Sequence, residues 1–187
     1  MARAPTAVAD TEALPEADRL EGFPHPRETR TLYGHASAET VLAEAYASGR
    51  MHHAWLVTGA EGIGKATLAY KAARGILARE DERGMFAQGL DVDPDGTSSR
   101  QILAQSHAGL LVLRRNWDFK SKRLMTVVSV DEVRRLRSFL TMSAGDQGWR
   151  VVIIDTADDM NANAANAVLK SLEEPPPRTV FFILSAS

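Results

Sequence analysis

The chain has 187 residues and a formal net charge of −2, with 44% hydrophobic and 25% charged residues. These values are typical of a soluble globular protein of one ordinary domain, and they argue against a protein whose main role is to grip nucleic-acid phosphates. Cysteine is absent, which excludes disulfides and thiolate metal sites. No apolar run approaches the ~18 residues that span a bilayer, and there is no signal-peptide pattern, so the sequence predicts a cytoplasmic protein without membrane contact.

The first part of the chain predicts a tail followed by a helix, a strand and a second helix. Residues 1–26 are polar, acidic and interrupted by prolines, so they can bury little surface and predict a mobile tail. Ala and Leu at helical spacing predict a helix over residues 35–48. The apolar run AWLVTG predicts a strand over 54–59, and a second helix with one apolar face is predicted over 65–78.

The middle of the chain predicts a connection, two strands and a helix. Residues 80–106 are rich in Gly, Asp and Ser and predict a long, flexible connection. The apolar runs at 109–115 and 124–130 predict two strands flanking the basic turn NWDFKSKR. Ser129 and the Glu three residues after it have the spacing of a capping box, which predicts a helix over 130–140.

The last part of the chain predicts the centre of a sheet. WRVVIID, at residues 149–155, is the strongest buried-strand pattern in the sequence. A helix is predicted over 160–174, where three consecutive prolines end it, and an apolar strand follows at 179–187. Apolar, β-branched runs separated by helices are typical of a parallel sheet covered on both faces, so the fold class is α/β.

The segment GAEGIGKAT, residues 59–67, joins a predicted strand to a predicted helix. Its spacing is that of a P-loop, whose main-chain amides and lysine cradle phosphate groups at a helix start. The alternative is a tight turn with a surface lysine. The residues expected to contact a nucleotide here are Gly59, Gly62, Ile63, Gly64, Lys65, Ala66 and Thr67.

One position in this loop departs from the P-loop pattern. A hydrolysing P-loop has Ser or Thr after the lysine, and that hydroxyl ligates magnesium; here the residue is Ala66. Thr67 cannot take over the role, because one helical residue turns a side chain by about 100°. We therefore expect ATP to be held by the backbone and Lys65, with magnesium weak or absent and without efficient hydrolysis.

Asp155 ends the strongest strand, where the magnesium-contacting aspartate of a P-loop ATPase is found. A helix cap is the alternative for this residue. Oligomeric ATPases usually have Glu at the next position to polarise the attacking water, and here it is Thr156. We expect Asp158 in the first turn of the following helix, as a cap or a partner of the helix dipole. Together with the change at position 66, Thr156 favours nucleotide binding over hydrolysis.

Other polar groups give weaker indications. His52 and His53 precede a strand, where packing and hydrogen bonding are favoured over contact with a base. The basic, aromatic-containing hairpin at residues 114–123 suits nucleic acid or a partner protein, but a solvated turn is the favoured interpretation. No Ser/His/Asp arrangement or histidine metal cluster has persuasive spacing.

Three segments of the sequence resemble one family. Between about residue 32 and residue 187 the chain contains, in this order, GRMHHAWLVTGAEGIGKATLAYKAARGIL, SVDEVRRLRSFL and WRVVIIDTADDMNANAANAVLKSLEEPPPRTVFFILSAS. Together they resemble the delta-prime subunits of the bacterial DNA polymerase III clamp loader, which are AAA+ P-loop proteins. NANAANAVLKSLEEPP is far more specific than the glycine loop, which many families share.

The resemblance implies a hetero-pentameric assembly that uses ATP to load the sliding clamp onto primed DNA during replication. The implied partners are the gamma or tau motor subunits and the delta wrench subunit. Delta-prime subunits do not hydrolyse ATP but offer an arginine finger to a neighbouring ATPase, so little or no ATPase activity is expected within this nucleotidyltransferase holoenzyme. Ser185 or Ser187 lies where the family has its sensor 1 residue, so Ser185 joins the expected site.

Some features depart from the family pattern. Many relatives bind zinc through four cysteines in the region matching residues 80–105, and without cysteine no zinc is expected here. SHAGLLVL replaces a more typical Ser-His-Pro-Asp start. The family continues beyond a strand like 179–187 into a helical lid and collar, where its arginine finger lies. The chain is therefore expected to be an AAA+ nucleotide-binding core alone, over residues 27–187.

The sequence thus favours a non-hydrolysing clamp-loader subunit with an AAA+ α/β fold. Two functions of other kinds stay open. One is an active P-loop ATPase or kinase, and the other is a purely structural module whose loop never binds ATP.

Overall fold

The protein is described by a computed structural model for residues 14–84, 89–142 and 148–186. The strands of its central sheet are β1 Ala54–Thr58, β2 Leu110–Arg114, β5 Arg150–Asp155 and β6 Thr179–Ser185. They are parallel and lie in the order β1-β6-β5-β2. The helices that cover them are α1 Ala36–Ala47, α2 Lys65–Leu77, α4 Thr97–Leu103, α5 Val130–Thr141 and α6 Ala162–Glu173.

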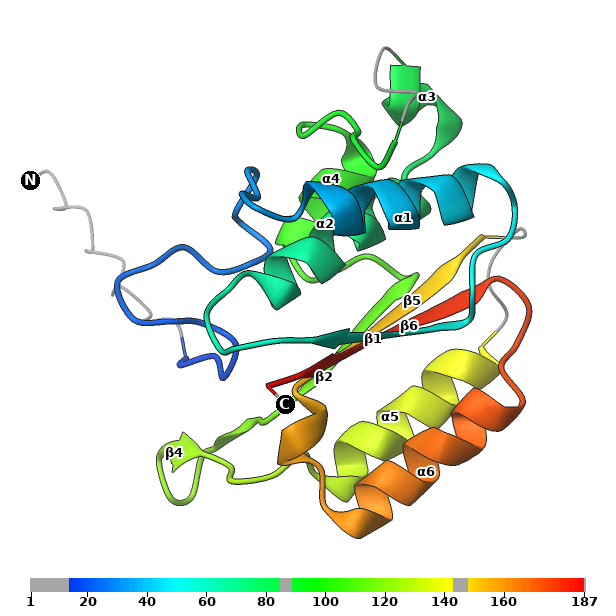
Figure 1. Ribbon diagram of the computed structural model, residues 1–187. Helices are drawn as coiled ribbons and strands as arrows, with labels where there is room; N and C mark the ends of the chain where they lie inside the picture. Colours follow the sequence, from blue (N-terminus) through cyan, green and yellow to red (C-terminus); the bar gives the residue numbers. More distant parts are fainter. Residues whose placement is uncertain (1–13, 85–88, 143–147, 187) are drawn as a thin grey trace, which may run out of the picture.

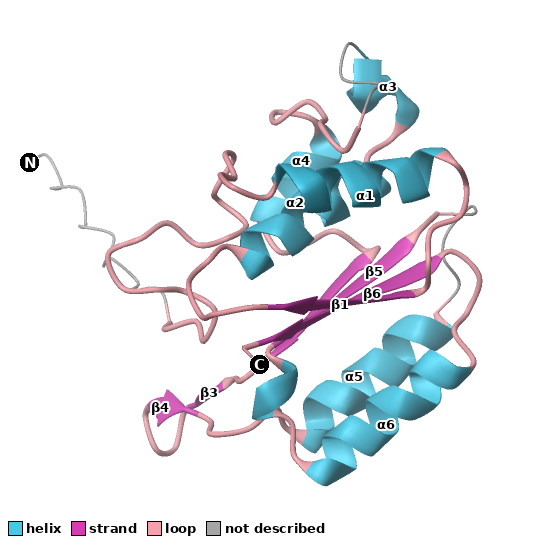
Figure 2. Ribbon diagram, in the orientation of Figure 1, coloured by secondary structure: helices cyan, strands magenta, loops and turns pink. Residues whose placement is uncertain are grey.

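The helices form one layer on each face of the sheet. Helices α1, α2 and α4 lie on one face, and α5 and α6 lie on the other (Figures 1 and 2). Alternate residues of β5 point to opposite sides: Val151 and Ile153 pack toward α2, whereas Val152 and Ile154 pack toward α5 and α6. All four are fully buried, as expected of a central strand in a parallel sheet. The α/β class predicted from the sequence is confirmed.

Local signals mark the starts of two helices. The side chain of Ser129 accepts a hydrogen bond from the N–H of Glu132 at 3.3 Å, which begins α5 as the capping-box spacing predicted. The side chain of Asn161 accepts from the N–H of Ala164 at 2.9 Å and begins α6. Such caps satisfy amides that have no partner inside the helix.

The prediction of a long flexible connection over residues 80–106 is wrong. The structure has a short helix α3, Glu80–Arg83, and the helix α4 in this region, although residues 85–88 lie outside the described part. Glu82 is buried and accepts hydrogen bonds from the N–H groups of Arg79 at 2.9 Å and Ser98 at 2.7 Å. This contact between distant positions orders the segment, and composition does not reveal it.

The strand predicted at 124–130 is also largely wrong. The antiparallel pair in this region is shorter, with β3, Trp117–Asp118, beside β4, Arg123–Leu124. Val128 is fully buried instead, and forms an isolated bridge with Met160. The run is apolar because it packs into the core, and a buried run need not be a strand.

The prediction that residues 1–26 bury little surface misses an anchor at His25, although most of the described residues 14–26 are exposed. Residues 1–13 lie outside that part. The side chain of His25 is fully buried, and its ring meets the ring of Tyr70 on α2 edge to face, with 5.7 Å between centroids. The segment 14–26 therefore packs against the domain. Among the described residues, no helix combines the length and the apolar character needed to cross a membrane.

Candidate functional site

The carboxyl ends of the parallel strands gather at one edge of the sheet. In the strand register Thr58 lies beside Ser185, and Arg114 lies beside Asp155. Strands β6 and β5 are neighbours, so the two pairs are adjacent. The glycine loop leaves this same edge, directly after β1. Ligands of α/β sheets bind outside the carboxyl ends of the strands, so this edge is the candidate site.

The glycine loop between β1 and α2 uses backbone conformations that favour glycine. Gly59, Gly62 and Gly64 have φ values of 145°, 79° and 100°. A Cβ atom at Gly59 would lie 2.6 Å from Cδ1 of Ile63, and one at Gly64 would lie 3.0 Å from Cδ1 of Leu32. Larger residues at these two positions would therefore strain or displace the loop.

Lys65 lies within this loop, with only 8% of the residue exposed. Its Nζ donates hydrogen bonds to the carbonyl oxygens of Gly59 at 2.6 Å and Ala60 at 2.7 Å. An ammonium group has three donors, so one remains after these two bonds. The loop's own carbonyls thus fix the position of its positive charge.

The amides that begin α2 add further donors. In the part of the chain that the structure describes, the main-chain N–H groups of Gly62, Ile63, Gly64 and Lys65 donate no hydrogen bond. The first bond inside the helix runs from the N–H of Leu68 to the carbonyl of Gly64, at 2.9 Å. Amides at a helix start carry partial positive charge. With the ammonium group they form a set of donors suited to anionic oxygens.

The two positions after the lysine offer little to a metal ion. Ala66 is half-buried and packs against the core on the α2 side, and its methyl group has no oxygen. Thr67 is half-buried in the next helical position. The site therefore brings phosphate donors together without the hydroxyl that a hydrolysing P-loop has.

Asp155 ends β5 beside these groups and is half-buried. Burial and the negative charge of Asp18 raise the pKa of Asp155 to about 6, against the opposing positive charges of Lys65 and Arg114. A carboxylate in such surroundings is stabilised in its charged form by an added cation. The next residue, Thr156, has no carboxylate to act as a base.

Ser185, expected as the sensor residue, contacts a different aspartate. Its Oγ donates to Oδ1 of Asp158 at 3.0 Å, and the N–H of Ala186 donates to Oδ2 at 2.8 Å. Asp158 lies in a short 3-10 helix, Ala157–Asp159, and joins it to the end of β6. Asp158 thus lies in the first turn of a 3-10 helix, and the expectation that it caps an α-helix is wrong, because Asn161 caps α6.

The N-terminal segment brings an ion cluster to the same edge of the sheet, which we call the N-terminal ion cluster. It consists of Glu16, Asp18, His25, Arg27 and Arg114. Glu16 accepts from Arg27 at 2.7 Å and from Arg114 at 2.9 Å, and Arg114 also pairs with Asp18. Burial would raise the pKa of Glu16, but the hydrogen bond from Arg27 and the charge of Arg114 outweigh it and lower the pKa to about 2.

The spacing of this cluster also resembles a metal site. Donor atoms of Glu16, Asp18 and His25 lie within 4.8 Å of one another. However, Nδ1 of His25 accepts from the N–H of Arg27 at 3.0 Å, so its Nε2 carries the proton that faces Asp18 at 3.0 Å. The guanidinium groups of Arg27 and Arg114 would repel an added cation. The charges of the cluster therefore balance one another, and its ion pairs hold the N-terminal segment on the domain.

Sequence reasoning missed this cluster because its members are far apart in the chain and form no local motif. It also placed Arg114 in a basic hairpin, whereas the structure has it inside the cluster. Arg115 is likewise occupied, with its Nε 2.8 Å from a carboxylate oxygen of Asp159. In the exposed part of the hairpin Phe119, 71% exposed, directly precedes the charged residues Lys120, Lys122 and Arg123.

The two histidines before β1 are exposed. The ring of His52 meets that of Trp55 edge to face, with 5.7 Å between centroids, and Nε1 of Trp55 donates to the carbonyl of His52 at 3.2 Å. For His52, this is the packing role that the sequence favoured.

Comparison with known proteins gives a consistent family. Residues 34–187 match the family described as "DNA polymerase III, delta subunit". The chain is 36% identical over 135 residues to the DNA polymerase III subunit delta' of Pseudomonas aeruginosa, covering 71% of this chain and 37% of that protein. It is 32% identical over 142 residues to subunit delta' of Escherichia coli, covering 76% and 39%.

Relatives with the names of other subunits match as well. The chain is 29% identical over 160 residues to the DNA polymerase III subunit gamma of Buchnera aphidicola, covering 84% of this chain and 40% of that protein. A solved gamma subunit-related protein from Thermotoga maritima is 14% identical, with a TM-score of 0.46, and the match covers 81% of this chain and 38% of that one. The chain thus spans about 40% of the length of each of these delta' and gamma subunits.

Proposed function

Because the chain belongs to the DNA polymerase III delta subunit family, we propose that it is a clamp-loader subunit of the delta-prime type that holds ATP without hydrolysing it efficiently. Its partners are then the gamma or tau motor subunits and the delta subunit. It meets the sliding clamp and primed DNA through that assembly. The triphosphate of bound ATP fixes the glycine loop against the edge of the sheet. The domain stiffened in this way is then a rigid support for a neighbouring ATPase subunit.

The observation that carries the nucleotide-binding part is the position of Lys65. Two loop carbonyls hold its Nζ at 2.6 Å and 2.7 Å, and one donor is left over. The amides of Gly62, Ile63 and Gly64 donate to no group within the described residues. A loop that served only as a turn would have no use for a buried ammonium group beside several unused amides, since burying a charge is costly.

The same site argues against efficient hydrolysis. Ala66 lacks the hydroxyl that orients magnesium, and Thr156 lacks the carboxylate that polarises water. Ser185 is bonded to Asp158 at 3.0 Å. The residues that remain can bind and orient phosphate groups, but position 156 offers no carboxylate to polarise the attacking water.

One observation favours a second candidate, a motor-type ATPase. The gamma subunit of Buchnera aphidicola aligns over 84% of this chain, more than the 71% that the delta' subunit of Pseudomonas aeruginosa covers. A motor-type subunit would turn over ATP repeatedly. Ala66 and Thr156 argue against this candidate, and a turnover assay separates the two.

Calorimetric titration of the full-length protein with ATP tests the binding proposal. We expect saturable heat for the wild type and, for Lys65→Ala, a loss of affinity of at least about tenfold, because the variant loses charge-assisted hydrogen bonds to phosphate. The matched control is Lys120→Ala, which removes an exposed lysine from the hairpin. If titration of the wild type gave no more binding heat than titration of Lys65→Ala, nucleotide binding at this loop would be rejected. The structural module would then be the remaining candidate.

Steady-state phosphate release tests whether the protein hydrolyses ATP, and a pull-down tests whether it joins the clamp-loader assembly. We expect phosphate release at background level in the isolated protein, and turnover above that level would favour the motor-type candidate. We expect the full-length chain to be retained by the gamma or tau and delta subunits together. Failure to be retained would reject membership of the clamp-loader assembly.

A further inference from the structure

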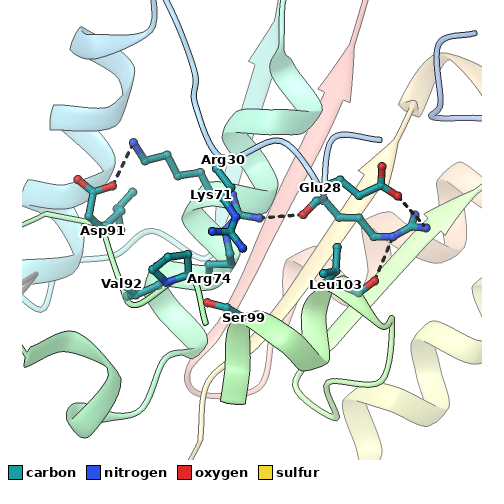
Figure 3. A pocket seen from close by; sticks show the side chains of 11 residues that line it. Glu28, Arg30, Lys71, Arg74, Asp91, Val92, Ser99 and Leu103 are labelled. Carbon is teal, nitrogen blue, oxygen red and sulfur yellow. Dashed lines mark hydrogen bonds and ion pairs between the residues drawn. The ribbon is translucent and has the colours of Figure 1, made fainter. Parts of the chain in front are cut away.

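A pocket of about 100 Å³ lies on the α2 side of the sheet, away from the glycine loop. The segment 27–30, the second half of α2, the loop 90–94 and α4 surround it (Figure 3). Arg74 of α2 and Arg30 of the N-terminal segment lie on its wall, and Leu90, Val92 and Leu103 give it an apolar side. Arg74 lies nine residues after Lys65, or about 14 Å along the helix at ~1.5 Å per residue. The pocket is therefore separate from the glycine loop.

Arg74 is the unusual member of this pocket. Its guanidinium donates to the carbonyl oxygens of Arg27 and Thr29, at 3.3 Å each. No carboxylate pairs with it among the residues that the structure describes. A guanidinium has five N–H donors, so most of them remain after these two long bonds. A cation that is largely buried without an opposite charge is costly.

A second positive charge makes this cost greater. Arg30 also lines the pocket, and its one ion pair within the described residues is with Asp95 at 3.3 Å. Both side chains of that pair are well exposed, at 65% and 80%, so the pair contributes little. Burial lowers the pKa of Arg74, and the charge of Arg30 lowers it further.

The other charged groups of the pocket already have partners. The carboxylate of Glu28 is 2.7 Å from Arg19, and that of Asp91 is 3.2 Å from Lys71. Lys71 also pairs with Glu39, and Arg27 pairs with Glu16 at 2.7 Å. Arg74 is therefore the pocket cation that has no ion-pair partner in the described part of the chain, and Arg30 has only its exposed pair with Asp95.

We propose that this pocket binds a small oxyanion of phosphate size through the guanidinium groups of Arg74 and Arg30. Guanidinium groups bind phosphate oxygens in pairs, and one anion between two of them removes their repulsion. The volume of about 100 Å³ leaves room for a phosphate group beside the two guanidinium groups. The binding is independent of the glycine loop and of the proposed clamp-loader role.

Titration with inorganic phosphate in a Lys65→Ala background tests this proposal, because that change weakens phosphate binding at the glycine loop. Calorimetry on the full-length protein should show one phosphate site in Lys65→Ala. Adding Arg74→Gln should weaken it by about tenfold or more, and adding Arg30→Gln should also weaken it, since each removes charge-assisted hydrogen bonds. Sulfate should compete for the site, and acetate, with a single charge, should compete less well.

Arg74→Gln also removes contacts that hold the 27–29 backbone, so Arg30→Gln provides the second test. Arg30 makes no hydrogen bond to that backbone in the described residues. The control is Arg134→Gln on α5, where the side chain is 75% exposed on the opposite face of the sheet. Absence of phosphate binding in Lys65→Ala would overturn the proposal. Phosphate affinity that neither Arg74→Gln nor Arg30→Gln lowers, relative to Lys65→Ala alone, would also overturn it and leave Arg74 as a structural contact of the N-terminal segment.

Discussion

Arg114 and Asp155 are register partners at the ends of neighbouring strands, yet the guanidinium of Arg114 pairs with Asp18 and Glu16 of the N-terminal segment. The positive charge nearest to Asp155 in the sheet is therefore shared with two other carboxylates. This arrangement explains why the pKa of Asp155 is about 6, because burial and the negative charge of Asp18 together outweigh the attraction of Arg114 and Lys65. The N-terminal segment thus affects the site's electrostatics as well as the packing.

The raised pKa of Asp155 predicts a pH-dependent cost to stability. The folded state holds this proton up to a pH of about 6, whereas the unfolded chain releases it near 3.8, so stability falls as the pH rises from about 4 to 6. Asp155→Asn removes the cost and should raise the free energy of unfolding above pH 6 by up to roughly 3 kcal/mol, at ~1.4 kcal/mol per pKa unit. Urea denaturation at pH 4 and pH 7.5 measures the effect.

The matched control for that experiment is Asp131→Asn, since the side chain of Asp131 is 81% exposed. It should change stability little at either pH. A gain for Asp155→Asn that is the same at pH 4 and pH 7.5 would contradict the account of this carboxylate.

The N-terminal ion cluster predicts a large effect of Arg114→Gln. The side chain of Asp18 is fully buried, its Oδ2 has no hydrogen-bond partner among the residues that the structure describes, and the change removes the guanidinium that pairs with Oδ1. Removing one partner of a buried pair costs about 3–5 kcal/mol of unfolding free energy, and chemical denaturation at pH 7 measures it. Arg134→Gln, which breaks an exposed pair, should cost at most about 1 kcal/mol. Equal losses in the two variants would show that the cluster does not hold the segment.

Most of the central fold could be predicted from the sequence. Strand β5 and helices α2 and α6 have strong local patterns, and Ser129 marks the start of α5. The glycine loop was found because its residues are consecutive and its conformation depends on glycine at fixed positions. Such features are set by neighbours in the chain, which a single sequence displays directly.

The missed features depend on contacts between distant residues. Arg114 and Asp18 pair across 96 positions, and Glu82 orders the region before α4 through Ser98, 16 positions away. The polar composition of both segments predicts exposure, because composition does not show which charges meet in the folded state. The bond between Ser185 and Asp158 was missed for the same reason.

Ala66 predicts that magnesium adds little to the affinity for ATP. The wild-type protein should bind ATP with similar affinity in magnesium and in EDTA, because no hydroxyl follows the lysine to ligate the ion. Ala66→Thr supplies that hydroxyl and should make magnesium strengthen binding by on the order of tenfold. Titrations with and without magnesium compare the two proteins, and Ala66→Val, which has the branched shape of threonine without its hydroxyl, is the control. A strong magnesium effect in the wild type would contradict this prediction.

The cap of α6 predicts a moderate loss of stability for Asn161→Ala. Its side chain accepts the N–H of Ala164 at 2.9 Å, and losing such a cap costs about 1 kcal/mol. Thermal denaturation measures the loss. Asn161→Asp keeps an acceptor and adds a favourable charge at the helix start, so it should retain stability. A loss as large for Asp as for Ala would exclude capping as the cause.

The most direct test of the central claim is to identify the nucleotide that the full-length protein retains. The protein is incubated with radiolabelled ATP, collected on a filter and washed, and the bound label is separated by chromatography. We predict that the wild type retains intact ATP and that Lys65→Ala retains none above background. Label retained as ADP with phosphate released into solution, or equal retention by the two proteins, would contradict a subunit that holds ATP without cleaving it.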